Sequence, residues 1–327
     1  MRRVGSIINP MHNFRVAPRT RSPYPSVMTQ QRTLTTRIWA ELFLLALIWG
    51  GVFLAVRLAL DEVPFVTSVA HRVFWAALIL WVYVWARGLA VPRSARVWGA
   101  LLVMGCLNNV IPFTLMAWGQ LHIPSGLASV FNSATALFGV LIAALILADE
   151  RLTKAKVIGS AVGFFGVATA IGLESLRNFD ITSLAQLAVV AGTISYAFAG
   201  VWARVMLAGL TPQVAAAGML TGSSLVMVPA AFLMDGVPSV TLSPTAFGAI
   251  AYYVIFATAG AYLLYYRILA ASGSANLMIV TLLMPPISIL LGALVLNESL
   301  SSNVYVGLAI LALGLLILDG RVFKRRR

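Results

Sequence analysis

The chain has 327 residues, of which 60% are hydrophobic and 10% are charged, and its formal net charge is +13. A soluble domain carries about 25% charged residues, so this chain lacks the polar residues needed to cover its surface in water. Spans of about 20 apolar residues cross a bilayer as helices. The composition therefore predicts an all-α integral membrane protein and argues against a soluble enzyme.

Short polar connections divide the chain into ten apolar runs, each long enough for a membrane helix. The connections carry turn or charged residues, as in "LDEVP" and "LHIPSG". The predicted helices cover approximately residues 37–60, 65–86, 97–119, 124–147, 154–174, 182–206, 211–234, 245–269, 273–296 and 302–319.

The two ends of the chain differ from its body in composition. Residues 1–36 are rich in Arg, Pro and Ser and contain no acidic residue, and residues 321–327 are basic. We expect a disordered cytoplasmic tail at 1–36 and a basic cytoplasmic tail at 321–327. The first tail lacks the apolar core of a secretory signal. An organellar transit peptide and a start codon assigned too early are the alternatives, and we favour a native start at Met28.

Lys and Arg are distributed unevenly along the chain. Of these 23 residues, 20 lie in the tails and in alternate loops, whereas one, Arg177, lies in the opposite loops. Cytoplasmic loops carry an excess of Lys and Arg, so we expect both termini in the cytoplasm of a multi-pass protein of the bacterial inner membrane. The positive net charge thus reflects topology in a lipid bilayer and does not indicate a nucleic-acid partner.

A sequence pattern recurs after 148 residues. Glu150, Leu152, Gly159 and Gly166 align without gaps with Glu298, Leu300, Gly307 and Gly314. This ordered recurrence indicates an internal duplication, with five-helix repeats at 37–176 and 177–320. Because five is odd, the second copy enters the membrane inverted. Secondary transporters use such inverted repeats and bind substrate between the copies near the membrane midplane, so we expect ten helices around a central cavity.

The segments "LLALIWGGVFLAVRLALDEVPFVTSVAHRVFWAALIL", "IPSGLASVFNSATALFGVLIAALILADERLTKAKVIGSAVGFFGV" and "AASGSANLMIVTLLMPPISILLGALVLNESLSSNVYVGLAILALGLL" carry a family resemblance. They resemble the EamA-type transporters of the drug/metabolite transporter superfamily over roughly residues 40–320. The resemblance implies ten helices, cytoplasmic termini, a central cavity and export of amino acids or related metabolites. Where many members have Glu-Pro in the ninth helix, this chain has Met284-Pro285.

Polar residues inside apolar spans are costly and tend to face a cavity or a neighbouring helix. Arg72 is a candidate carboxylate clamp for an amino-acid substrate or a candidate member of a gate pair, and the alternative is an arginine bonded to backbone carbonyls at a helix end. For the amides and Thr281, packing between helices is the alternative. Pro285, followed by Pro286, should break its helix and free carbonyl groups toward a cavity, or else produce a simple kink. The polar candidates are His71, Arg72, Asn108, Asn109, Asn132 and Thr281.

Aromatic residues form the second group of candidates. At 100° per residue, Tyr252, Phe256, Tyr262 and Tyr266 share one sector of the eighth helix. Such a wall would favour apolar or aromatic substrates. A belt at the lipid interface is the alternative for residues near helix ends, such as Tyr266 and Trp118. Trp49 and Tyr196, which are equivalent by the repeat, complete the candidate set.

These features favour a transporter that exports small metabolites, above all neutral, apolar or aromatic amino acids, by alternating access. Efflux of drugs or lipophilic cations is the alternative within the class. An integral-membrane enzyme or a non-transporting receptor are the alternatives from other classes. The sequence contains no phosphate-binding loop, nucleophile elbow or HExxH zinc motif. We therefore expect no cofactor and no metal. We expect a small-molecule substrate in a cavity that a monomer is able to form alone, and the oligomeric state stays open.

Overall fold

The computed structural model describes residues 35–147, 153–172, 181–239, 241–272, 277 and 279–319. All regular structure within these ranges is helical. Most of the first tail, the basic tail at 321–327 and the charged connection at 148–152 lie outside the described residues, as do Met28, Glu150 and Arg177.

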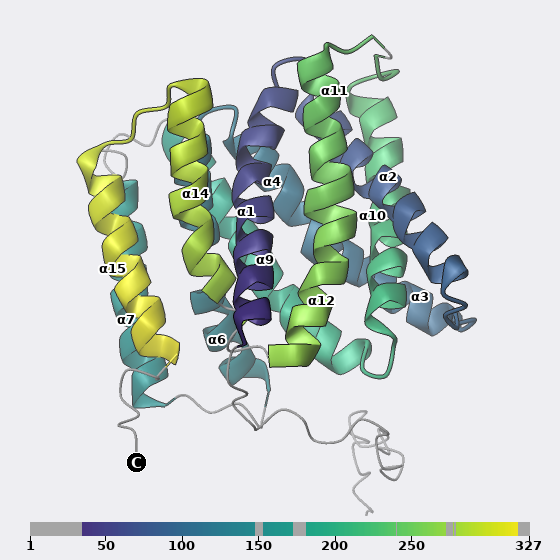
Figure 1. Ribbon diagram of the computed structural model, residues 1–327, viewed down its shortest axis with the longest axis horizontal. Coiled ribbons are helices and arrows are strands. Elements are labelled where there is room, and N and C mark those ends of the chain that lie inside the picture. Colours follow the sequence, from purple (N-terminus) through teal and green to yellow (C-terminus); the bar gives the residue numbers. More distant parts are fainter. Residues whose placement is uncertain are drawn as a thin grey trace, which may run out of the picture.

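The first half of the chain forms helices that run back and forth through a bundle (Figure 1). They are α1 (Thr36–Ala59), α2 (Phe65–Ala86), α3 (Ala95–Gly105), the π-helical segment η3 (Cys106–Val110), α4 (Ile111–Gly119), α5 (Ser125–Asn132), α6 (Thr135–Ile146) and α7 (Lys154–Ile171). Three of these, α3, η3 and α4, follow one another as a single span, Ala95–Gly119, and α5 and α6 together form the span Ser125–Ile146.

The second half of the chain continues the bundle. Its helices are α9 (Ile181–Met206), α10 (Pro212–Met234), α11 (Pro244–Ala251), the π-helical segment η4 (Tyr252–Gly260), α12 (Ala261–Ser272), α14 (Ile279–Leu296) and α15 (Ser302–Asp319). The segments α11, η4 and α12 form one long span, Pro244–Ser272.

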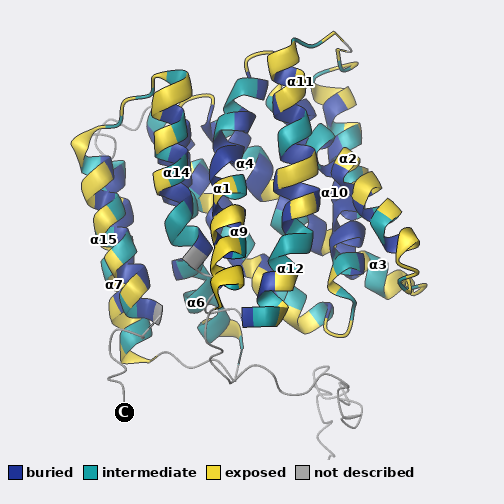
Figure 2. Ribbon diagram, in the orientation of Figure 1, coloured by how far each residue is buried: buried dark blue, intermediate teal, exposed yellow. Residues whose placement is uncertain are grey.

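By length and composition, eight helices in the described part of the chain are apolar enough to cross a membrane. Two shorter apolar helices, Val280–Leu296 and Ser302–Leu318, accompany them. Figure 2 shows exposed residues on the outward faces of the bundle, and many of these are large and hydrophobic, including Trp85, Leu145 and Leu233. Such a surface is stable when lipid surrounds it and would aggregate in water.

Glycines allow α7 and α15 to pack closely along one edge of the bundle (Figure 1). A Cβ atom added at Gly166 would lie 2.4 Å from the backbone nitrogen of Leu311, and one added at Gly314 would lie 2.4 Å from that of Gly163. Because only glycine leaves room for this approach, the small residues of both helices serve helix packing.

Three spans depart from regular α-helix near their middle, and in one of them, Pro244–Ser272, the irregular segment is η4. In the span Ala95–Gly119, Pro112 has no N–H to bond the carbonyl of Asn108, four residues earlier, and the π-helical segment η3 lies directly before this proline. In the span Ser125–Ile146, the helix stops at Asn132 and restarts at Thr135.

The expected break at Pro285 and Pro286 is wrong. The helix α14 continues through both prolines from Ile279 to Leu296. The carbonyl of Thr281, which lacks an N–H donor at Pro285, instead accepts a hydrogen bond of 2.9 Å from the Ser133 hydroxyl. An outside donor therefore replaces the missing helical one, and the helix need not open.

Candidate substrate cavity

A cavity of about 540 Å³ lies in the middle of the bundle. Pockets that bind small molecules have volumes of about 300–1,000 Å³. Residues from all the described helices except α7, α11 and α15 contribute to its wall. The polar and aromatic lining residues are Trp49, Phe53, Ser68, Arg72, Asn108, Phe113, Gln120, Asn132, Thr135, Tyr196, Tyr262, Tyr265, Tyr266 and Thr281.

Arg72 is the charged side chain in this wall. Its Nε donates a hydrogen bond of 2.9 Å to the hydroxyl of Thr258, on η4. Its guanidinium carbon lies 3.8 Å from the centre of the Phe113 ring, within the range of a cation–π interaction. In the described part of the chain Arg72 makes no ion pair and no bond to a backbone carbonyl, so these contacts do not match the helix-end alternative.

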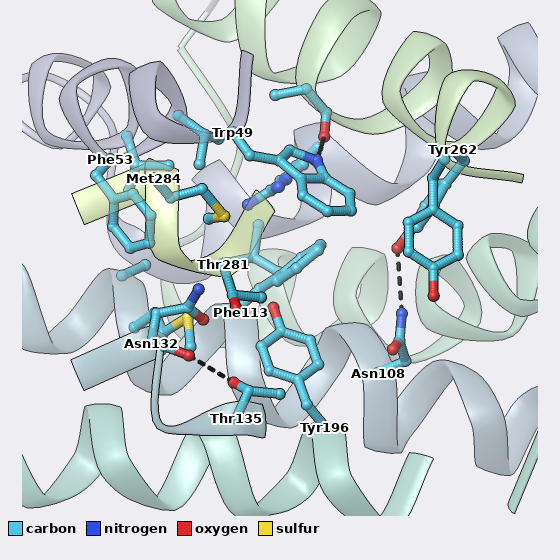
Figure 3. A pocket seen from close by; sticks show the side chains of 18 of the residues that line it. Trp49, Phe53, Asn108, Phe113, Asn132, Thr135, Tyr196, Tyr262, Thr281 and Met284 are labelled. Atoms are coloured by element: carbon cyan, nitrogen blue, oxygen red, sulfur yellow. Dashed lines mark hydrogen bonds between the residues drawn. The ribbon is translucent and has the colours of Figure 1, made fainter. Parts of the chain in front are cut away.

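A hydrogen-bonded cluster joins η3 to the second half of the chain. The Asn108 Nδ2 donates to the Tyr262 hydroxyl over 3.1 Å, and this hydroxyl donates to the Asn109 Oδ1, also over 3.1 Å. Asn109 is fully buried, and its Nδ2 donates to the Ser223 hydroxyl over 2.9 Å. Figure 3 shows Asn108 and Tyr262 side by side in the wall. The cluster fixes the Tyr262 ring and places Asn109 behind it.

Opposite this cluster, the interruption between α5 and α6 brings polar groups to the wall. The Thr135 hydroxyl donates to the Asn132 carbonyl over 2.7 Å, which satisfies a group that the break leaves without its helical partner. The Asn132 amide and the Tyr196 hydroxyl have no protein partner in the described residues. Figure 3 shows the Tyr196 hydroxyl pointing toward the centre of the cavity.

An aromatic wall closes another side of the cavity. The ring centres of Trp49 and Tyr265 lie 5.8 Å apart, and those of Tyr265 and Tyr266 lie 5.2 Å apart. The Trp49 Nε1 donates to the carbonyl of Ala257 over 3.1 Å, which ties this wall to η4. These rings offer a large apolar area at the cavity wall.

Eight of the candidates predicted from the sequence meet in this one cavity. They are Trp49, Arg72, Asn108, Asn132, Tyr196, Tyr262, Tyr266 and Thr281. Asn109 lies directly behind them through its bond to Tyr262. Residues from nearly every span are thereby brought together at one place.

Five of the predicted candidates do not line this cavity: His71, Trp118, Tyr252, Phe256 and Pro285. Phe256 is 53% exposed, on the outer surface of η4. The Tyr252 hydroxyl donates to the Ile48 carbonyl over 3.0 Å, between helices. Both residues lie in a π-helical segment, which has more residues per turn than an α-helix. A projection at 100° per residue therefore places them in the wrong sector.

The other three were misplaced for simpler reasons. The Trp118 ring packs edge-on against His122, with ring centres 5.2 Å apart. The His71 Nδ1 accepts a hydrogen bond of 3.1 Å from Trp75, one turn along α2. Pro285 lies inside α14, where its neighbour Met284 occupies the wall.

Several wall residues were missed by the sequence analysis. Phe53, Phe113 and Tyr265 look like ordinary apolar or interfacial residues in their helices. Gln120 was a detectable signal, because it is a polar residue at the end of an apolar span. It is 3% exposed, and its Oε1 has no hydrogen-bond partner.

At the end of the bundle shown at the top of Figure 1, which we call the upper end, carboxylates bind helix N-termini across the two halves of the chain. Glu298, which follows α14, accepts hydrogen bonds of 2.8 and 3.2 Å from the backbone N–H groups of Ser125 and Gly126. It also accepts one of 2.9 Å from the Ser125 hydroxyl. The carboxylate thus satisfies the unpaired N–H groups at the start of α5.

Two further contacts of this kind surround a smaller cavity of about 190 Å³, which His71 also lines. Asp235, which follows α10, accepts 2.9 and 2.7 Å hydrogen bonds from the N–H and hydroxyl of Thr67 in α2. Glu62 accepts a 2.9 Å bond from the Ser243 N–H and a short bond from its hydroxyl at the start of α11. These two bonds lower the pKa of Glu62 below its ordinary value, because they stabilise the carboxylate.

A bundle of apolar helices around a central aromatic and polar cavity is typical of a membrane protein that binds small molecules. The EamA-like transporter family matches this chain twice, over residues 38–172 and 183–318. The chain therefore belongs to the EamA-like transporter family. It is a multi-pass membrane protein, and its family and relatives are transporters and not enzymes.

Three further comparisons show what the chain is similar to. It is 27% identical over 300 residues to the probable terminal-alkyne amino-acid exporter of Streptantibioticus cattleyicolor, which covers 90% of this chain and 97% of that protein. It is 24% identical over 286 residues to the uncharacterized inner membrane transporter YedA of Escherichia coli K12, covering 86% and 90%. One crystal structure matches with a TM-score of 0.64 at 20% identity, over 89% of this chain and 99% of the other, and supports the fold.

Proposed function

We propose that the protein exports small metabolites, in particular neutral amino acids with apolar or aromatic side chains. The observation that carries the proposal is the composition of the central cavity, in which an aromatic wall faces one arginine and a set of neutral hydrogen-bonding groups. An apolar surface with a few placed polar groups is typical of sites that bind small amphipathic molecules. The relative from Streptantibioticus cattleyicolor bears the name of an amino-acid exporter, which agrees with this substrate class.

We further propose an architecture of ten membrane helices in two inverted five-helix repeats, residues 37–176 and 177–320, which move against each other for alternating access. The double family match supports it. So does the pairing of α7 with α15, where Gly166 approaches Gly307 and Gly159 approaches Gly314. The two contacts are equivalent under the sequence repeat, because Gly314 lies 148 residues after Gly166 and Gly307 lies 148 residues after Gly159. Two related halves are expected to produce such a matched pair of contacts.

The orientation is proposed from the charges. With both termini in the cytoplasm, the basic loops face inward, and Glu62, Asp235 and Glu298 face outward at the upper end. We also propose a bacterial inner membrane as the location, by analogy with relatives such as YedA. The tails at 1–36 and 321–327 belong to the cytoplasmic side in this arrangement.

The test is transport by purified full-length protein in liposomes loaded with unlabelled substrate. Counterflow of labelled L-phenylalanine or L-leucine, absent from protein-free liposomes, is the expected result. Phe256→Ala is a matched control, because this aromatic side chain lies outside the cavity. Counterflow of labelled tetraphenylphosphonium without that of any amino acid would instead favour efflux of lipophilic cations, the alternative that the aromatic wall also allows.

A further inference from the structure

The charge of the central cavity is unbalanced. Arg72 lines it, and none of its lining residues, all within the described part of the chain, is Asp or Glu. Removing a charge from water without a counterion is costly unless other groups compensate. A substrate that brings a negative charge to Arg72 supplies the missing counterion.

The geometry of Arg72 shows which part of its side chain is left for this substrate. Thr258 accepts the Nε–H, and Phe113 covers one face of the guanidinium. In the described residues, the two terminal nitrogens have no acceptor, and the side chain is part of the cavity wall. Two adjacent terminal N–H groups with fixed orientation match the two oxygens of a carboxylate.

The cavity offers less to an ammonium group. Its wall provides neutral acceptors, such as the Tyr196 hydroxyl and the Asn132 amide, but no carboxylate. Hydrogen bonds between ionised partners are about twice as strong as those with neutral groups. Arg72 also repels a cation through a medium of low dielectric constant, where charges interact strongly.

We propose that the cavity recognises its substrate by the carboxylate and does not require the amino group. The inference rests on the proposed function and deepens it. Aromatic and apolar monocarboxylates without an amino group are then ligands comparable to the amino acids, whereas amines that lack the carboxylate are excluded. Arg72 binds the carboxylate, and Thr258 positions Arg72.

Three probes with the same phenyl group separate these contributions: L-phenylalanine, 3-phenylpropanoate and 2-phenylethylamine. Each is tested on the full-length protein as an inhibitor of L-phenylalanine counterflow and, independently, as a ligand that raises the midpoint of thermal unfolding. We expect 3-phenylpropanoate to act within about threefold of the concentration of L-phenylalanine, and 2-phenylethylamine to need at least about tenfold more. The inference is overturned if the amine matches the acid, or if removal of the amino group weakens binding tenfold or more.

The variants assign the preference to named residues. Arg72→Gln should abolish the difference between acid and amine. Arg72→Lys should retain only part of it, because an ammonium cannot form the paired contact. Thr258→Val should reduce affinity for both acids by a similar factor and leave the amine unchanged. Arg57→Gln is the matched control, because Arg57 pairs with Asp61 outside the cavity and should keep the wild-type preference.

The outcomes also separate this inference from the proposed function. If both acids raise the unfolding midpoint of the wild type but L-phenylalanine shows no counterflow, carboxylate recognition holds and export of this amino acid is rejected. If L-phenylalanine is transported and the preference for acids survives in Arg72→Gln, the export function holds and the role of Arg72 is rejected. If Arg72→Gln fails to fold, the three probes on the wild type and the Thr258→Val comparison decide the question.

Discussion

The hydroxyl of Ser133 donates a 2.9 Å hydrogen bond to the backbone carbonyl of Thr281, and these two residues are 148 positions apart in the chain. This is also the spacing of the sequence repeat. Residues in equivalent positions of two related halves touch each other only close to the axis that relates the halves. The bond therefore lies where an internal axis is expected, at the break between α5 and α6 and beside the prolines of α14.

Ser133→Ala is expected to destabilise the protein, because it removes the hydrogen bond that the Thr281 carbonyl accepts from the Ser133 hydroxyl. Such a loss costs about 0.5–1.5 kcal/mol. Ser129→Ala is the matched control, one turn earlier on α5, since the buried Ser129 hydroxyl has no partner and its removal should cost little. The midpoints of thermal unfolding of both variants in detergent measure the difference. Equal midpoints would show that the Ser133 bond adds no stability.

Parts of this site were predictable from the sequence, and the reasons differ by residue. Arg72, Asn108 and Asn132 stand out as polar residues in apolar spans, where burial is tolerated only beside a cavity or a partner. Phe113 and Phe53 carry no such signal, because a phenylalanine that lines a cavity looks the same in sequence as one that faces lipid. Their place depends on helix pairing, which a single sequence does not reveal.

The irregular helices were the main source of error. Angular projection placed Tyr252 and Phe256 in the cavity because it assumed α-helix through residues that are π-helical. No proline lies within η4 to reveal it in the sequence, whereas η3 precedes Pro112. The prolines at 285 and 286 drew attention to α14, but the interruption lies in the other half, after Asn132.

Tyr262→Phe is expected to impair transport more than Phe256→Ala, although the two residues were predicted to share one face. Loss of the Tyr262 hydroxyl removes two hydrogen bonds, one from Asn108 and one to the buried Asn109, and leaves the weaker 3.2 Å bond between the two amides. Two hydrogen bonds worth about 0.5–1.5 kcal/mol each correspond to roughly tenfold slower counterflow at a fixed substrate concentration, since about 1.4 kcal/mol is a factor of ten. Phe256→Ala should stay near wild type. The reverse order would place Phe256 in the substrate path.

The contact between Glu62 and Ser243 should make stability depend on acidity. Its hydrogen bonds lower the pKa of Glu62 below the ordinary value of 4.5, so the carboxylate is favoured in the folded state. The stabilisation is therefore fully present above about pH 4.5 and is lost as the pH falls through the lowered pKa. The midpoint of thermal unfolding of wild type should exceed that of Glu62→Gln at pH 6. The two midpoints should converge as the pH falls below the lowered pKa of Glu62. A constant difference between them at all pH values would contradict this origin.

The proposed topology predicts that the two ends of the bundle face opposite compartments. In a Cys106→Ala background, which removes the single native cysteine, Ser302→Cys should react with a membrane-impermeant maleimide in intact cells. Arg93→Cys, in an exposed basic loop, should react only after permeabilisation. The positive-inside distribution of Lys and Arg is the physical reason. Labelling of both positions from the same side would reject the inverted arrangement.

Transport is expected not to be driven by a proton-binding carboxylate in the membrane. Such a group should lie where both sides reach it in turn, near the midplane. None of the residues that line the cavity is Asp or Glu, and Met284 occupies the wall beside Pro285. Glu41 lies near the start of α1, at the end of the bundle opposite Glu62, where Arg267 pairs with it over 2.7 Å.

His71 is the remaining titratable group to consider, because an unperturbed imidazole titrates near pH 6.5. Its Nδ1 accepts a hydrogen bond from Trp75, and it lines the smaller cavity beside Asp235 instead of the central one. We therefore expect movement down the gradient of the substrate itself. In liposomes, an imposed pH gradient at zero membrane potential should not drive uphill accumulation of labelled L-phenylalanine. Uphill accumulation that His71→Gln abolishes would instead assign proton coupling to His71, through the smaller cavity at the upper end.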